Sequence, residues 1–181
     1  MLNEKNNKRI VLAGGPSTGK TSVLNELKKL GFVCFGEAAR DILSDYSLKG
    51  SNFKLDPIKI SNEILTKRDS DYNDAFKISC KNDIIFYDRG VHEITAYLRS
   101  INQSNDYWEK LLKNYKYDMV FIFPSWREIY TKDDNRIEEY EEAIKISPFI
   151  NKIYDESSIL SIEVPNISVK ERVEFIINNI Q

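Results

Sequence analysis

Gly14-Gly15-Pro16-Ser17-Thr18-Gly19-Lys20-Thr21 is the stretch, near the start of the chain, that decides the fold. It fits the pattern G-x-x-x-x-G-K-[ST], which forms a loop between a buried strand and a helix. The run before it, residues 9–13 (RIVLA), is short and apolar, as expected for a buried strand. Residues 19–30 after it carry apolar side chains at helical spacing. The flanking sequence therefore meets both structural conditions for a phosphate-binding loop.

The residue types of this loop suit a chain of phosphates. Glycine lets backbone amides approach a ligand closely, and the N-terminus of the following helix attracts anions. We expect the loop from Gly14 to Ser22 to bind phosphates, with Lys20 as the mobile cation and the Thr21 hydroxyl serving a Mg²⁺ ion. A glycine-rich turn that binds no ligand is the alternative.

Outward from this loop, short apolar runs alternate with longer amphipathic ones. Strands are predicted at 9–13, 32–35, 83–87, 119–123 and 159–164. Helices are predicted at 19–30, 38–46, from Pro57 into 69–81, and at 93–101, 107–115, 137–155 and 169–180. This alternation predicts an α/β fold, with a five-stranded, mainly parallel sheet between two layers of helices. We expect one domain over residues 1–181, with an arginine-bearing lid at about 125–137.

Composition excludes several classes of function. The chain of 181 residues has 26 Lys plus Arg against 28 Asp plus Glu, so a formal charge of -2 offers no strong basic surface for nucleic acid. No apolar run reaches the roughly 18 residues of a membrane helix, and the N-terminus lacks the apolar core of a signal peptide. We expect a cytoplasmic protein without a membrane span, and the oligomeric state stays open.

Asp88 and Arg89 directly follow the apolar run 83–87 (DIIFY). An acid at the end of a strand beside the loop's strand can hold Mg²⁺, and a neighbouring arginine can reach a phosphate or a substrate hydroxyl. In the alternative interpretation, Asp88 only caps the following helix.

Glu37 follows the second predicted strand, and Arg40 lies one helical turn further. A carboxylate there could accept the proton of a hydroxyl that attacks a γ-phosphate. Alternatively, Glu37 is a first-turn acid that favours the helix dipole, and Arg40 is a surface charge.

The segment from Trp126 to Arg136 is highly charged. Arginines on a closing segment, here Arg127 and Arg136, can meet the charge of a transferred phosphate while excluding water. In the alternative interpretation, this segment is a solvated, charged helix face.

His92 is the only histidine, and we expect it at a helix start or in the core; Tyr97 and Trp108 are also expected in the core.

Five stretches taken together give a resemblance to a known family: LAGGPSTGKTSVLNEL, the Glu37-Ala38-Ala39-Arg40 box, FYDRG, FPSWREIYTKDDNR and VPNISVKERVEFI. Over nearly its whole length the chain resembles small stand-alone P-loop proteins, often named AAA-domain ATPases. These group with the ribosylnicotinamide kinase domain of the bifunctional NAD-biosynthesis regulator. They look like the nucleoside and nucleotide kinase branch of P-loop proteins.

The resemblance implies roles for particular residues. The triphosphate of ATP would be held by Gly14, Gly19, Lys20 and Thr21, and the metal by Asp88. Glu37 would be the base, and substrate or transferred phosphate would contact Arg40, Arg89, Arg127 and Arg136. Pro165 and Asn166 would border the adenine. The substrate-reading residues of ribosylnicotinamide kinases are not found, so the resemblance does not imply that acceptor.

Three functions follow from these residues. The first is an ATP- and Mg²⁺-dependent kinase of a small hydroxyl-bearing metabolite such as a nucleoside. The second is a regulatory switch that binds ATP or GTP and hydrolyses it slowly. The third is a degenerate module with a structural role.

Overall fold

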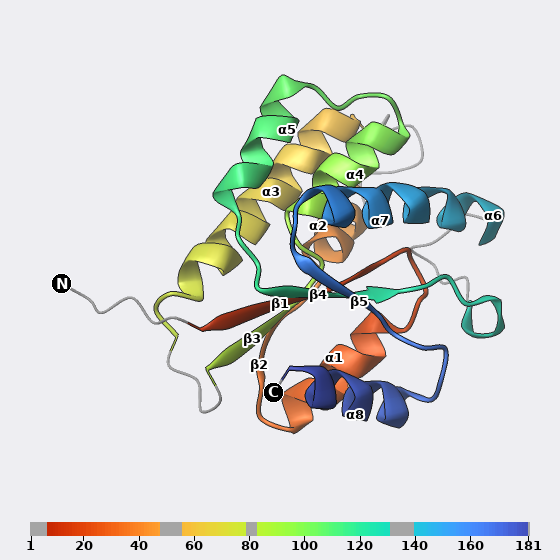
Figure 1. The fold of residues 1–181 in the computed structure, drawn as a ribbon. Coiled ribbons are helices and arrows are strands. Elements are labelled where there is room, and N and C mark those ends of the chain that lie inside the picture. The colour runs from red at the N-terminus through yellow and green to blue at the C-terminus, as the bar shows by residue number, and fades with distance from the viewer. Residues whose placement is uncertain (1–6, 48–55, 79–82, 131–139, 181) are drawn as a thin grey trace.

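A five-stranded parallel sheet forms the centre of the computed structural model, which describes residues 7–47, 56–78, 83–130 and 140–180 (Figure 1). Its strands are β1 (Lys8–Gly14), β2 (Val33–Phe35), β3 (Ile84–Asp88), β4 (Met119–Phe123) and β5 (Leu160–Glu163). They lie in the order β2-β3-β1-β4-β5, and every pair of neighbours is parallel. The predicted α/β fold is confirmed.

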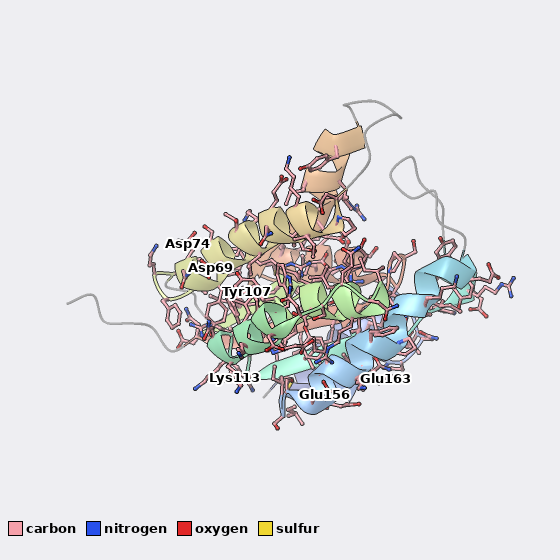
Figure 2. The ribbon with its side chains drawn as sticks, turned by 90° about the horizontal axis from the view of Figure 1, so that it is seen from above. Asp69, Asp74, Tyr107, Lys113, Glu156 and Glu163 are labelled. Carbon is pink, nitrogen blue, oxygen red and sulfur yellow. The ribbon has the colours of Figure 1, made fainter. Side chains whose placement is uncertain are left out.

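Helices cover both faces of the sheet (Figure 1). One layer consists of α1 (Lys20–Lys29) and α8 (Val169–Asn179). The other consists of α3 (Pro57–Asp74), α4 (His92–Ser100), α5 (Asp106–Leu111) and α7 (Ser147–Glu156), with α2 (Ala38–Ser47) packed on α3. In the view from above, the charged side chains of Asp74, Lys113 and Glu156 lie around the outside of this second layer (Figure 2).

The central strand β1 contributes to a core on each face. Ile10 and Leu12 pack with the apolar side chains of α1 and α8, whereas Val11 and Ala13 pack with those of α3, α4 and α7. Successive side chains of a strand point to opposite faces, so a strand covered on both sides is a continuous apolar run. This burial explains why residues 10–13 are apolar throughout.

The predicted helix at 137–155 is wrong as a single element. The structure has α6 (Tyr140–Ala143), a 3₁₀ turn η3 (Ile144–Ile146) and then α7, with Pro148 in the first turn of α7. Proline has no backbone N–H to continue a helix but fits a first turn, so it separates the two pieces. The helix predicted at 107–115 is also shorter than expected, because α5 is followed by a 3₁₀ turn, η1 (Leu112–Asn114).

The start of α3 follows the sequence closely. Asp56 accepts hydrogen bonds from the backbone N–H groups of Ile58 and Lys59, and Pro57 occupies the first turn as predicted. The core prediction is confirmed for Trp108 and wrong for Tyr97, whose side chain is 43% exposed on α4. An apolar pattern does not distinguish the edge of a buried helix face from its centre.

The segment after β4 is described only in part. Arg127–Ile129 forms one 3₁₀ turn, η2, and residues 131–139 lie outside the described residues, so the lid stays a prediction. Within the described ranges, no helix is both long and apolar enough to cross a bilayer.

Candidate active site

The strand order brings the predicted site residues to one edge of the sheet. β1 lies between β3 and β4, with Leu12 opposite Asp88 and Gly14 opposite Phe123. In open parallel sheets, ligands bind at the carboxyl ends of the strands where the strand order reverses. The loop after β1 and the residues after β3 therefore share this position.

The loop after β1 depends on two glycines in different ways. A Cβ on Gly14 (φ +141°) would lie 2.4 Å from the carbonyl oxygen of Phe123, so the close approach of β4 requires glycine. Gly19 is left-handed (φ 87°) and sits at the N-cap of α1, and Ser17 is also left-handed (φ 53°). This backbone turns the loop sharply into α1, as an anion-binding loop requires.

Lys20 is buried inside the loop. Its Nζ donates hydrogen bonds to the carbonyl oxygens of Gly14 (3.0 Å) and Gly15 (2.7 Å) and to Oγ1 of Thr18 (3.0 Å). Burial lowers the pKa of Lys20 to about 7, and the charge of Arg89 acts in the same direction. A triphosphate on the loop would supply the negative charge that such a buried amine lacks.

Asp88 and Thr21 form a pair of oxygen donors beside Lys20. The Thr21 hydroxyl donates to Oδ2 of Asp88 at 3.3 Å, while Oδ1 is buried and has no hydrogen-bond partner among the described residues. Burial raises the pKa of Asp88, which is 2% exposed. Mg²⁺ prefers oxygen ligands, so a hydroxyl beside a buried carboxylate oxygen without a partner fits this ion. The residue at the N-cap of α4 is Val91, so the capping interpretation of Asp88 is wrong.

Arg89 connects two segments. Its backbone is left-handed (φ 74°), which is uncommon for a residue other than glycine. Its Nε donates to Oε1 of Glu37 at 3.0 Å, and its Nη1 donates to the carbonyl oxygen of Gly14 at 2.7 Å. Burial alone would lower the pKa of Arg89, but Glu37, Glu93 and Asp88 outweigh it and raise that pKa.

Glu37 lies directly before α2, and its carboxylate is mostly buried. Besides the ion pair with Arg89, its Oε2 lies 3.8 Å from Nε of Arg40, a half-exposed side chain. The structure therefore brings Glu37, Arg40 and Arg89 together beside the phosphate loop, as predicted.

Arg127 lies apart from this group of side chains. Arg127 is 77% exposed, with its Nη2 3.8 Å from Oε1 of Glu141 and its guanidinium over the Tyr140 ring, so its contacts are with α6. Arg136 lies outside the described residues. Pro16 is half-buried in the loop, and Ser22 is exposed on α1.

Arg172 of α8 is a residue that sequence reasoning missed. It is 1% exposed, and its guanidinium donates to the carbonyl oxygens of Thr18 (2.8 Å) and Pro165 (3.1 Å) and to Oδ1 of Asn166 (3.0 Å). It also lies over the Trp126 ring, 4.7 Å from the ring centroid. One signal was available, because Arg172 occupies an apolar position in the helical repeat of 169–180. It joins the phosphate loop to the segments after β4 and β5.

A small cavity lies between α3 and the end of β3. It is lined by Phe35, Gly36, Arg68, Asp71, Tyr87, Asp88, Arg89 and Tyr117. Arg68 donates from Nη1 to the carbonyl oxygen of Gly90 at 2.6 Å, while its Nε and the Tyr87 hydroxyl are buried without hydrogen-bond partners among the described residues. Sequence reasoning missed Arg68, although it continues the stripe of residues 60, 64 and 72 along the buried face of α3.

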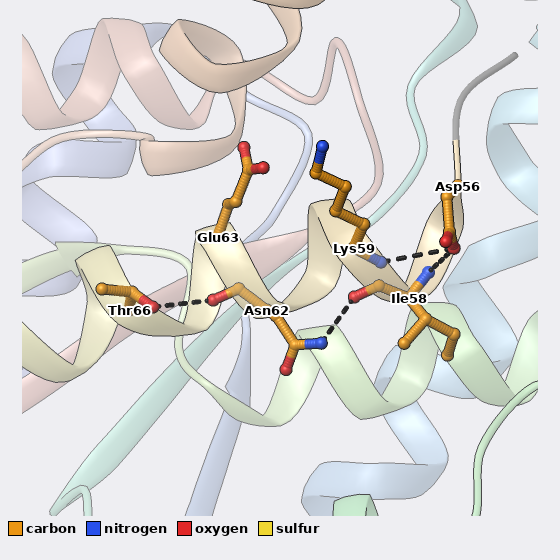
Figure 3. Close-up of a pocket in the computed structure, with 6 residues that line it drawn as sticks. All are labelled: Asp56, Ile58, Lys59, Asn62, Glu63 and Thr66. Carbon is orange, nitrogen blue, oxygen red and sulfur yellow. Dashed lines mark hydrogen bonds between the residues drawn. The ribbon is translucent and has the colours of Figure 1, made fainter.

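A wider hollow lies on the first half of α3 (Figure 3). It is lined by Asp56, Ile58, Lys59, Asn62, Glu63 and Thr66. Its polar groups already have partners: Asp56 caps the N-terminus, the Asn62 and Thr66 side chains donate to carbonyl oxygens four residues earlier, and Glu63 accepts from the Tyr46 hydroxyl of α2. The small cavity beside Asp88 lies at the predicted site, but its volume of about 10 Å³ has room for no more than one water molecule.

His92 lies behind the site, in the core. Its ring stacks on Tyr154 with centroids 5.5 Å apart, and Nδ1 is buried without a partner among the described residues. Burial lowers the pKa of His92 to about 4. The prediction of a core histidine is confirmed.

Comparisons with known proteins agree with the fold. A family model described as an AAA domain matches residues 9–172. No curated protein matches the chain by sequence.

Several solved structures share the fold. The NadR protein in complex with NR has a TM-score of 0.77 at 14% identity, covering 97% of this chain and 51% of NadR. Thymidylate kinase from Candida albicans has a TM-score of 0.73 at 15% identity, covering 97% of this chain and 91% of that kinase. Deoxyadenosine kinase from M. mycoides, with dATP bound, has a TM-score of 0.70 at 16% identity, covering 96% and 98%. The chain therefore has the fold of the P-loop nucleoside and nucleotide kinases.

Proposed function

The chain belongs to the AAA-domain family of P-loop proteins, and from that membership we propose that it is an ATP- and Mg²⁺-dependent kinase. It transfers the γ-phosphate to a hydroxyl group of a small metabolite, such as a nucleoside. The deoxyadenosine kinase that shares its fold supports an acceptor of this class.

One observation carries the proposal: Arg89 bridges Glu37 and the carbonyl oxygen of Gly14. This contact sets a carboxylate beside the loop where the γ-phosphate would lie. A protein that only binds and hydrolyses a nucleotide slowly needs no base for an acceptor there, whereas a kinase uses a base to receive the proton of the acceptor hydroxyl.

On this proposal, the phosphates of ATP bind to the backbone amides of the loop from Gly14 to Ser22. Lys20 leaves the loop carbonyls to neutralise phosphate charge, since a triphosphate is the stronger partner for an ammonium group. Thr21 and Asp88 would hold Mg²⁺, which would supply positive charge to balance the charge on the phosphate oxygens.

Glu37 is the proposed base. The acceptor hydroxyl gives its proton to the Glu37 carboxylate as its oxygen bonds to the γ-phosphorus, and ADP leaves with the electrons of the broken P–O bond. Arg89, with Arg40 at the entrance, holds the transferred phosphate and keeps Glu37 oriented. Arg127 and Arg136 are proposed to approach the phosphates from the lid.

The adenine is proposed to lie by Pro165 and Asn166. Support comes from Arg172, which connects both residues to the carbonyl of Thr18 in the phosphate loop. The buried guanidinium of Arg172 would then fix the position of the adenine relative to the phosphates of the same nucleotide.

The test is ADP release across a panel of nucleosides, nucleotides and sugars, with and without each acceptor. We expect at least one acceptor to increase ADP release and to appear as a phosphorylated product. Asp88→Asn should bind ATP but lose Mg²⁺-dependent turnover, because the amide keeps the shape and removes the charge that balances the metal. Asp74→Asn, on the outer surface of α3, is the control. ADP release that no acceptor changes would favour the regulatory switch instead.

A further inference from the structure

Glu93 lies in the first turn of α4, behind the active site, and its side chain is buried, with 5% of the residue exposed. A buried carboxylate is costly unless hydrogen bonds replace the water that it loses. The contacts that stabilise Glu93 therefore indicate what it does in the fold.

Four donors surround this carboxylate. Its Oε1 accepts from the backbone N–H of Gly14 and from Nη1 of Arg89, both at 3.4 Å. Its Oε2 accepts from the backbone N–H of Gly90 at 2.7 Å and from the Tyr154 hydroxyl at 3.2 Å. Gly14 begins the phosphate loop, and Gly90 ends the Asp88–Gly90 turn.

We propose that Glu93 is a positioning residue that couples the phosphate loop to Arg89, an inference that rests on the proposed kinase function. Its two carboxylate oxygens accept hydrogen bonds from the phosphate loop and from the Asp88–Gly90 turn. These bonds therefore fix the distance between the loop and the turn. The left-handed backbone of Arg89 needs such support, because this conformation is disfavoured for a residue with a Cβ.

The alternative is a purely structural role, in which Glu93 stabilises the start of α4 through the N–H of Gly90. Glu93→Gln separates the two roles because it keeps the shape of the side chain. Every neighbour of the carboxylate is a donor, whereas an amide has one oxygen and one NH₂ group. If the NH₂ group faces Gly14 and Arg89, both lose their acceptor; if it faces the other side, the N–H of Gly90 loses its acceptor while the Tyr154 hydroxyl can turn to accept.

The experiment is a double-mutant cycle of Glu93→Gln with Arg89→Lys, which keeps the charge of residue 89. The melting temperature of all four proteins is measured first. The formation of phosphorylated product is then measured for each protein well below the lowest of these temperatures. Tyr154→Phe is the matched control, because it removes one donor to Glu93 without touching the loop or Arg89.

If Glu93 acts through Arg89, Glu93→Gln should lower kcat roughly 10- to 100-fold in the wild-type background, in line with the effect of a small misplacement of catalytic groups. In the Arg89→Lys background it should lower kcat less than about 3-fold, because coupled residues are not additive. Tyr154→Phe should lose stability but keep kcat within about 2-fold. If Glu93→Gln lowers kcat by the same factor in both backgrounds, or lowers the melting temperature without lowering kcat, the proposed coupling is overturned.

A second readout does not depend on turnover. Hydrogen exchange of the Gly14 amide should become at least about 10-fold faster in Glu93→Ala, which removes the acceptor of that amide outright, and stay unchanged in Tyr154→Phe. Unchanged exchange in Glu93→Ala would overturn the proposal even if the enzyme is active. Faster exchange in a protein that phosphorylates no acceptor would support the coupling and count against the kinase function alone.

Discussion

The phosphate loop and the Asp88–Gly90 turn meet at the same edge of the sheet but are held in different ways. Inside the loop, Lys20 donates to carbonyl oxygens only five and six residues before it, and Arg89 and Arg172 add contacts from outside. The turn is held by side chains from other elements. Arg68 of α3 donates to the Gly90 carbonyl, and the Tyr117 hydroxyl accepts from the N–H of Val91.

This difference predicts different sensitivities. Changes in the loop should affect ligand binding while leaving the fold intact, because its groups face the ligand position. Changes around the turn should affect stability and catalysis together, since the side chains that hold it are also part of the core. The predictions below use variants that test each side of this contrast.

The largest effect is expected in the loop. Lys20→Ala should weaken the affinity for MgATP roughly 100-fold, because hydrogen bonds to a charged group are worth up to about 3 kcal/mol. Calorimetry with ATP and Mg²⁺ measures it. Lys29→Ala, at the exposed end of the same helix, should bind like wild type. Unchanged affinity in Lys20→Ala would rule out this loop as the triphosphate site.

On the side of the turn, His92 should make stability depend on pH. Its pKa is about 4 in the folded protein, against an ordinary 6.5. The unfolded chain therefore takes up a proton first as the pH falls, so this contribution is fully present above pH 6.5 and is lost between about 6.5 and 4.

Between pH 7.5 and 4.5, wild type should lose about 2 to 3 kcal/mol more unfolding free energy than His92→Phe, which keeps the ring and removes the titration. Urea unfolding at the two pH values gives this difference. Equal losses in both proteins would mean that His92 titrates normally and that the region behind the turn is not tightly buried.

A smaller effect is expected where α8 supports the loop from outside. Arg172→Lys keeps the charge but cannot donate to Thr18, Pro165 and Asn166 together, so MgATP should bind roughly 10-fold more weakly. The exposed Lys170→Met, two residues away, is the comparison. Identical dissociation constants for the two variants would leave Arg172 as a packing residue without influence on the nucleotide.

The contrast also explains what the sequence could predict. The five strands and the loop were predictable because each depends on a local pattern: an apolar run, a glycine where β4 approaches, a helix that begins at Lys20. Asp88, Arg89 and Glu37 were predictable because each directly follows a strand, and parallel strands end at one edge.

Arg68, Glu93 and Arg172 were not predicted, because each acts through contacts with residues distant in sequence or with backbone groups. Their common signal is a charged residue at a position that the helical pattern assigns to the core. The break between α6 and α7 had a local signal in Pro148, which marks the first turn of a helix as readily as its interruption.

The most direct test of the account concerns the proton of the acceptor. Glu37→Gln is compared with wild type in two assays: product formation with the best acceptor found, and acceptor-free ADP release. If Glu37 is the base, product formation should fall about 10²-fold or more, while acceptor-free ADP release stays within a few-fold of wild type. Equal rates of product formation in the two proteins would contradict the role of Glu37 and the mechanism built on it.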